Sequence, residues 1–458
     1  GGDDAIGTFN ASGLLNGQGT LTADIYNLSD GAVTEVLANL GSGTLNSAGS
    51  AVLNGDAAVE TANVNSGLLN LNGQLTDVVN LTIADGGTLM SGSPDRINDA
   101  ATANIAAGGS WILNGNDTIA TLNSGGLLNG TGTLTAETYN LTDGAVTNIL
   151  ANLGSGTLNS DESVTLNGNA AVETANVSSG TLALNGQLTD VTNLNIFESG
   201  TLLSGSAERI NDAATANITT GGTLTLNGEE TITTLNSGGL LNGSGTLTAE
   251  TYNLTDGAVT ETLANLGAGI LNSDGAVTLY GDAAAELTNV NTGTLNLNGQ
   301  LPAVGELNIS EGATLVNGSA ERINDAAVVN NAGTMTLAGD ENVTTFNADG
   351  GLLDGSGLLT AETYNLNDGT ATAAGADLGT GTLNSGPGEV TLEGNTNANA
   401  INIESGALNT NGAVQNQRGV ITVASEATWN VNSSYTYDTL RGEGTVDPGA
   451  LNGNTFRN

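Results

Sequence analysis

The chain has 458 residues, of which 38% are hydrophobic and only 3% aromatic, so we expect a narrow core of Leu, Val, Ile and Ala. It carries 47 acidic residues against 6 basic ones, with no His and a formal net charge of −41. Because Lys and Arg neutralise phosphate groups, this charge argues against nucleic acid and anionic membrane surfaces as partners. The absence of Cys excludes disulfides, Cys-ligated zinc and thiol catalysis.

No stretch of the sequence approaches the roughly 18 consecutive apolar residues of a membrane helix, so we expect no direct membrane insertion. The segment that starts at Gly1 has neither a charged nor an apolar leader region. We therefore interpret the chain as a mature segment or an excerpt.

The chain is built from a long internal repeat. The stretch GLLNGTGTLTAETYNLTDGAVTNILANLGSGTLNS at 126–160 occurs in four copies, which begin at Gly13, Gly126, Gly239 and Gly351. Such fidelity indicates one array rather than separate globular domains. In chain order we predict one continuous solenoid, made of the end of a preceding coil (1–12), three superrepeats of about 113 residues (13–125, 126–238 and 239–350), and a degenerate fourth with C-terminal coils (351–458).

Each superrepeat contains about six shorter segments that average about 19 residues. Within a segment apolar and polar residues alternate, as in Thr223, Leu224, Thr225 and Leu226, which predicts a strand with one buried face. The best helical candidate, at 149–153, is too short to support a helix. Pairs such as Asn185-Gly186 and Asp256-Gly257 punctuate the strands, because Asn and Gly tolerate positive φ.

Asn-Gly between strands also favours antiparallel hairpins, so a meander or sandwich is an alternative. A coil of about 19 residues, however, suits three short strands and three turns, one circuit of a β-helix. We therefore predict an all-β fold, a right-handed parallel β-helix (β-solenoid) of about 24 coils, with Leu stacked on Leu inside and Thr or Asn ladders outside.

Two kinds of phrase carry a resemblance to known families. The stretches TYDTLRGEGTV (436–446) and ATLNSGGLLNGTGTL (120–134) resemble the strand repeats of autotransporter passenger domains. The stretches TLTLNG (223–228) and NLTIADGGTL (80–89) are similar to coils of filamentous-haemagglutinin-like adhesins. The resemblance implies a right-handed β-helix exposed on a microbial surface and serving adhesion, aggregation or scaffolding. It identifies no functional residues.

Arginines and tyrosines recur in register and are the first candidates for binding. Arg96, Arg209 and Arg322 follow an acid in DRINDAA or ERINDAA, and form either carboxylate- or sugar-binding forks or, as we prefer, local ion pairs that close a wide turn. The recurring tyrosines stack on sugar rings or, as we prefer, pack on the coil. They are Tyr26, Tyr139, Tyr252 and Tyr364. Trp111 and Trp429 are single, and Arg418, Arg441 and Arg457 concentrate basic charge near the C-terminus.

Acidic turns are the candidates for calcium, although each stands alone, and calcium wants about six to eight oxygens. They contain Asp30, Asp143, Asp256 and Asp368. The sequence also contains glycosylation sequons, which leave this modification open. They include those that begin at Asn27, Asn140 and Asn253. We predict no catalytic residues, no metal ligands and no cofactor other than calcium as an alternative, and we assign no binding residues.

The function that we expect is a structural or adhesive extracellular fibre or stalk at a microbial cell surface. The expected partners are further copies of the chain, stacked end to end, and host or neighbouring-cell glycans. The alternatives are a repeat-displaying glycan- or calcium-binding adhesin module and a surface-layer lattice protein. We expect no enzyme, and a polysaccharide-degrading β-helix is the least favoured alternative, because without His, Cys or Lys catalysis would depend on carboxylates and Arg.

Overall fold

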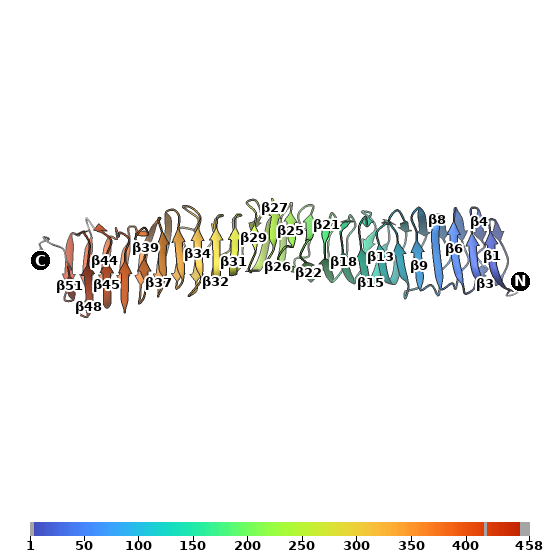
Figure 1. The fold of residues 1–458 in the computed structure, drawn as a ribbon. Helices are drawn as coiled ribbons and strands as arrows, with labels where there is room; N and C mark the ends of the chain where they lie inside the picture. The colour runs from blue at the N-terminus through green and yellow to red at the C-terminus, as the bar shows by residue number, and fades with distance from the viewer. Residues whose placement is uncertain (1–3, 416–418, 449–458) are drawn as a thin grey trace. The chain divides into compact units, whose positions relative to one another are not determined.

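The computed structural model describes residues 4–415 and 419–448 (Figure 1). These residues form 51 strands and no helix, arranged as a β-solenoid of about 23 turns with a spacing of about 19 residues. The chain divides into two compact units, Gly1–Ile232 (unit 1) and Thr233–Asn458 (unit 2). Each unit is described by itself. Residues 1–3, which belong to the predicted N-terminal coil fragment, and Arg418 and Arg457 lie outside the described residues.

The strands of unit 1 are short, and most have three to five residues. They are β1 (Asp4–Ala11), β2 (Leu14–Leu15), β3 (Gly19–Leu28), β4 (Ala32–Thr34), β5 (Ala38–Leu40), β6 (Thr44–Ala48), β7 (Ala51–Leu53), β8 (Thr61–Leu71), β9 (Asn80–Ile83), β10 (Gly87–Ser91), β11 (Thr102–Ile105), β12 (Ser110–Leu113), β13 (Asp117–Ser124), β14 (Leu127–Gly130), β15 (Thr133–Leu141), β16 (Val146–Thr147), β17 (Asn152–Leu153), β18 (Thr157–Ser160), β19 (Ser163–Leu166), β20 (Thr174–Val177), β21 (Gly180–Leu184), β22 (Asn193–Ile196), β23 (Gly200–Ser204), β24 (Thr215–Ile218) and β25 (Thr223–Leu226).

The unit boundary falls within β26 (Glu230–Ser237). The strands of unit 2 follow the same pattern. They are β27 (Leu240–Gly243), β28 (Thr246–Leu254), β29 (Val259–Thr260), β30 (Asn265–Leu266), β31 (Ile270–Leu279), β32 (Leu287–Leu297), β33 (Glu306–Ile309), β34 (Thr314–Asn317), β35 (Val328–Asn331), β36 (Thr334–Leu337), β37 (Glu341–Ala348), β38 (Leu352–Gly355), β39 (Leu358–Leu366), β40 (Ala371–Thr372), β41 (Asp377–Leu378), β42 (Thr382–Ser385), β43 (Glu389–Leu392), β44 (Ala400–Ile403), β45 (Gly406–Thr410), β46 (Val414–Gln415), β47 (Val420–Val423), β48 (Ala427–Val431), β49 (Tyr435–Thr436), β50 (Thr439–Gly442) and β51 (Thr445–Asp447).

Each coil contributes a strand to two broad stacks and a short strand or a single bridge to a third. In unit 1 one stack contains β18, β20, β22 and β24, and the second contains β19, β21, β23 and β25. Single parallel bridges form the third, for example from Leu153 to Ala170 and on to Leu188. All the pairings described within the units are parallel, so the antiparallel meander or sandwich that we kept as an alternative is wrong.

Parallel stacking places identical side chains opposite one another on successive strands, as the alternation predicted. Leu182, Leu202 and Leu224 lie opposite one another on successive strands of unit 1, and each is completely buried. On the outer face Thr181 lies opposite Thr201, which lies opposite Thr223. The core of each coil is therefore a layer of aliphatic side chains, repeated from one coil to the next.

The Asn-Gly turn at Gly186 works by a different mechanism from the one that we expected. Gly186 has no positive φ, but a Cβ at this position would lie 2.0 Å from the carbonyl oxygen of Gly168, its equivalent one coil earlier. Close stacking of one backbone on the next therefore requires glycine here. The Asp-Gly turn at Gly257 does have the positive φ that we expected, at 91°. The helical candidate at 149–153 contains a turn at 149–150 and the strand β17, and Ile149 is 70% exposed.

The superrepeat also buries one serine hydroxyl in each copy. Ser47, Ser160, Ser273 and Ser385 are fully buried, and their Oγ atoms have no hydrogen-bond partner among the described residues. In the neighbouring coil the buried Thr147 hydroxyl accepts hydrogen bonds from the amides of Asn167 and Gly168, at 3.0 and 3.1 Å. A buried hydroxyl without a partner costs free energy, whereas a partnered one contributes to stability.

We predict that Ser160→Ala increases the local opening free energy of its coil by about 1 kcal/mol, because the change removes a buried polar group without a partner. The matched change Thr147→Ala removes an acceptor that is in use, and should decrease the same quantity. Hydrogen exchange of the amides in β18 and β19 measures both effects locally, which suits a repeat protein whose coils open separately. A loss of protection in the Ser160→Ala variant would contradict the prediction.

Candidate functional site

The four recurring tyrosines are buried, and their hydroxyls bond to the backbone. The Tyr139 oxygen accepts a hydrogen bond from the Ala136 amide at 2.8 Å and lies 2.8 Å from the Leu134 carbonyl oxygen, to which it donates. The other copies, Tyr26, Tyr252 and Tyr364, make the same contacts and, like Tyr139, are 0% exposed. Burial raises the pKa of Tyr139, Tyr252 and Tyr364 to about 12. The coil-packing interpretation is confirmed, and these rings are not available for stacking on sugars.

The recurring arginines lie in the wide loops that join two strands within a coil, such as the loop between β23 and β24. The guanidinium Nε of Arg209 donates to the Oγ of Ser206 at 2.8 Å, and Arg322 bonds to Ser319 in the same way. Arg96 bonds to Ser93 through Nε at 2.7 Å. Each guanidinium is therefore held by the serine three residues earlier. The ion pair that we expected in these loops stays a prediction.

A buried carboxylate from the next coil reaches each of these loops, and the sequence did not single it out. Asp117, Glu230 and Glu341 are the first residues of β13, β26 and β37, and at most 1% of each is exposed. Their oxygens accept the backbone amides of the arginine and of the isoleucine that follows it in the loop. Burial raises the pKa of Asp117 to about 6 and raises the pKa of Glu230 and Glu341 above the ordinary value. These acids would have been found as acidic residues at inward-facing positions that recur once per superrepeat.

The residue before each arginine has a left-handed backbone. Asp95, Glu208 and Glu321 have φ values of 53°, 55° and 55°, which residues other than Gly rarely adopt. The carbonyl oxygens of these residues accept hydrogen bonds from a glutamine side chain of the preceding coil, which is Gln187 for Glu208, at 2.9 Å. The loop is thus strained at one residue and tied to the coils on both of its sides.

The acidic turns cap the following coil. The Oδ1 atoms of Asp30, Asp256 and Asp368 accept backbone amides about 20 residues further along the chain, at 2.8 to 3.0 Å. Asp143 is exposed in its turn. Within 4–415 and 419–448, no three His, Cys, Asp or Glu side chains gather in a way that could hold a metal ion. The capping contacts give these aspartates a structural role, and calcium binding at the turns stays untested.

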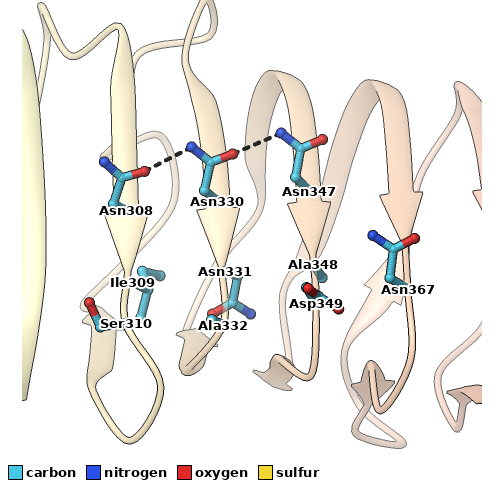
Figure 2. A pocket seen from close by; sticks show the side chains of 10 residues that line it. All are labelled: Asn308, Ile309, Ser310, Asn330, Asn331, Ala332, Asn347, Ala348, Asp349 and Asn367. Carbon is cyan, nitrogen blue, oxygen red and sulfur yellow. Dashed lines mark hydrogen bonds between the residues drawn. The ribbon is translucent and has the colours of Figure 1, made fainter.

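Asparagines form an amide ladder along the outer face of one strand stack. In each step the Nδ2 of one Asn donates to the Oδ1 of the Asn one coil earlier, for example from Asn330 to Asn308 and from Asn347 to Asn330, both at 2.8 Å (Figure 2). The described residues of both units contribute rungs to this ladder. They are Asn10, Asn27, Asn46 and Asn63; then Asn104, Asn123, Asn140, Asn159, Asn176, Asn195 and Asn217; and Asn236, Asn253, Asn272, Asn289, Asn308, Asn330, Asn347, Asn365, Asn384 and Asn402.

The three sequon asparagines named above belong to this ladder. Asn27, Asn140 and Asn253 donate their Nδ2 hydrogen to the preceding rung, at 2.8 to 2.9 Å. Attachment of a glycan to this nitrogen would break the rung. The geometry therefore disfavours glycosylation of the folded chain at these sites.

A shallow surface groove of about 360 Å³ lies beside the ladder in unit 2 (Figure 2). Asn308, Asn330 and Asn347 contribute to one of its walls, and Ile309 and Ala348 line it as well. The amide of the buried Asn331 beside it donates to the Leu352 carbonyl oxygen, at 3.1 Å. The surface of the groove is mainly apolar, and the amide groups of Asn308, Asn330 and Asn347 on it are already engaged with one another.

The remaining candidates are structural or exposed. Trp111 and Trp429 are fully buried, and their indole nitrogens donate to the hydroxyls of Ser91 and Thr410, both at 3.1 Å. Arg441 lies on β50 and is exposed. In the described residues, no helix has the length and apolar character that crossing a membrane requires.

Comparison with known proteins gives no further assignment. No family model matches the chain, and no curated protein matches it. The recurring tyrosines, asparagines and turn aspartates bond to their own coil or to a neighbouring coil.

We predict that Tyr139→Phe decreases the local opening free energy by about 1 to 3 kcal/mol, because the Ala136 amide loses a buried acceptor. Hydrogen exchange of the Ala136 amide measures this change. Tyr280→Phe is the matched control, since the Tyr280 side chain is 47% exposed and its hydroxyl is not part of a buried contact. Equal effects of the two substitutions would show that the buried hydroxyl contributes nothing.

Proposed function

We propose that the chain is a structural or adhesive extracellular protein of a microbial surface, which forms a rigid fibre or stalk. The observation that carries the proposal is the use of the repeated polar side chains. The tyrosines, the ladder asparagines and three of the four turn aspartates bond to their own or to neighbouring coils. A superrepeat whose polar groups connect stacked coils is suited to forming a long and rigid structure.

The charge of the chain supports a solvated outer surface. Acidic residues outnumber basic ones by 47 to 6, and a large net charge keeps a long sheet-rich surface soluble. The proposal includes end-to-end stacking of copies, since a terminal coil presents unpaired backbone groups unless another coil covers it. It assigns no catalytic activity to the chain and no role for nucleic acid or membrane insertion.

A second candidate function, a surface lattice, is favoured by one observation. An apolar pair is exposed at the tip of the same turn in successive superrepeats: Val36 and Leu37 are 68% and 56% exposed, and Ile149 and Leu150 are 70% and 57% exposed. In the third copy Leu263 is 65% exposed. Repeated apolar tips are suited to lateral contacts between molecules.

The glycan-binding alternative is weakened by the burial of the tyrosines, which were its aromatic candidates. No contact among the described residues specifically supports calcium binding. If the experiment described next is repeated with a chelator or with a soluble glycan, particles that change would support the corresponding alternative.

We predict that electron microscopy of the purified chain across a dilution series shows threads that lengthen with protein concentration. Pairing of terminal strands explains this growth, because open sheet edges template further pairing. A double substitution, Ile149→Asn with Leu150→Asn, tests the lattice: lateral sheets that disappear while threads persist would support it. Phe197→Asn is the control, since Phe197 is 42% exposed and does not recur in the superrepeat. Single particles of constant length at all concentrations would contradict self-assembly.

A further inference from the structure

Glu230 is a buried acid with an unusual set of partners. Its Oε2 accepts hydrogen bonds from the amides of Arg209 and Ile210, at 2.9 and 3.1 Å, and the Arg209 amide also lies 3.0 Å from Oε1. Its Oε1 lies 2.7 Å from the Oγ of Ser204, which is also buried. The same Ser204 Oγ lies 2.9 Å from the carbonyl oxygen of Ser206, in the wide loop between β23 and β24.

The serine hydroxyl has one proton for these two acceptors. When Glu230 is ionised, Ser204 donates either to the carboxylate or to the Ser206 carbonyl, and the other oxygen loses this bond. When Glu230 carries a proton on Oε1, it donates to the Ser204 Oγ, and the serine donates onward to Ser206. The amides of Arg209 and Ile210 keep the Oε2 acceptor in both states. One proton taken up from solvent therefore completes a continuous hydrogen-bond chain from the acid to the loop.

We infer that Glu230 and Ser204 form a proton-operated latch, which holds the loop at 205–212 against the next coil when protonated and loosens it when ionised. The strained residue Glu208, with a φ of 55°, lies within this loop. Because opening releases this backbone strain, the loop opens more easily once the chain of bonds is broken.

Acidic side chains near Glu230 disfavour its ionisation, whereas the positive charge of Arg209 favours it. The loop brings Glu208, Arg209 and Asp212, and the acid's own segment adds Glu229. Desolvation raises the pKa of Glu230 first, and the charge of Glu208 adds to the increase. Since the closed form binds the proton more tightly than an open, solvated form, the latch is fully closed below the ordinary carboxyl pKa. It is lost as the pH rises through the raised value.

The third superrepeat provides a natural comparison. Asn317 occupies the position of Ser204, and its Nδ2 donates to Oε1 of Glu341, while its Oδ1 accepts the Ser319 amide at 3.1 Å. An amide nitrogen has no lone pair for an acid proton, so a proton on Oε1 of Glu341 could not be donated to Asn317 as it can to Ser204. The first superrepeat differs again. Here Ser91 accepts a hydrogen bond from the indole N–H of Trp111, and the shorter Asp117 accepts hydrogen bonds from the loop amides.

The experiment is hydrogen exchange of the full chain at pH 5 and pH 8, corrected for the intrinsic exchange rate at each pH. Peptides that cover 205–212 and 318–325 report the two loops. We expect protection of the Arg209 and Ile210 amides to fall between pH 5 and pH 8, because the pKa of Glu230 is raised in the closed loop. The pKa of Glu341 is raised as well, but Asn317 offers no hydroxyl to complete the chain of bonds, so the loop at 318–325 should lose less protection.

Substitutions separate the latch from general pH effects. Glu230→Gln places an amide where the protonated acid would be, so it should keep the loop at 205–212 protected at both pH values. Ser204→Asn should decrease the pH response of this loop, and Asn317→Ser should increase the response of the other. Protection of β18 to β22 in each variant controls for folding.

Two results would overturn the latch. One is the same pH dependence in both loops of the unsubstituted chain, and the other is a pH response of the loop at 205–212 that persists in Glu230→Gln.

Discussion

The parallel register between successive coils is the constraint on which the rest of this structure depends. Backbone hydrogen bonds hold adjacent strands about 4.8 Å apart, so each side chain meets its counterpart from the coils before and after it. Leu202 between Leu182 and Leu224 shows what this means for the core. Each inward position must suit its own copies, which favours aliphatic side chains of similar size.

The same constraint turns single polar residues into columns. An asparagine that recurs once per coil donates to its predecessor and accepts from its successor, so the amide groups satisfy one another along a strand stack (Figure 2). Where two backbones stack too closely for a Cβ, as at Gly168 and Gly186, glycine recurs instead. Conservation of a residue from copy to copy in this chain therefore reflects coil contacts before it reflects binding.

The sequence predicted the parts of the fold that follow from periodicity. Alternation such as that from Thr223 to Leu226 gave the strand faces, the segment length gave the coil, and the repeated tyrosines were correctly interpreted as packing residues. The number of turns, about 23, is close to the 24 that we expected. These features depend on local patterns that each copy repeats.

Contacts between coils at irregular offsets were not predictable in the same way. Glu230 reaches Arg209 and Ser204 across 21 and 26 residues, and although its inward-facing position recurs once per superrepeat, the sequence does not show which loop it contacts. Ser160 looks like any other polar residue of a turn-rich chain, yet it is buried without a partner among the described residues. Both require knowledge of which residues share a coil interface, which the three-dimensional register supplies.

The most direct test of this account is a deletion that preserves the register. Removal of 126–238, one whole superrepeat, joins Gly125 to Gly239, the equivalent of Gly126. Hydrogen exchange should then show unchanged protection in the remaining coils, whereas removal of 126–229 shifts the register within a coil and should abolish protection near the junction. Loss of protection throughout the chain after the register-preserving deletion would contradict the claim that coil register alone organises the protein.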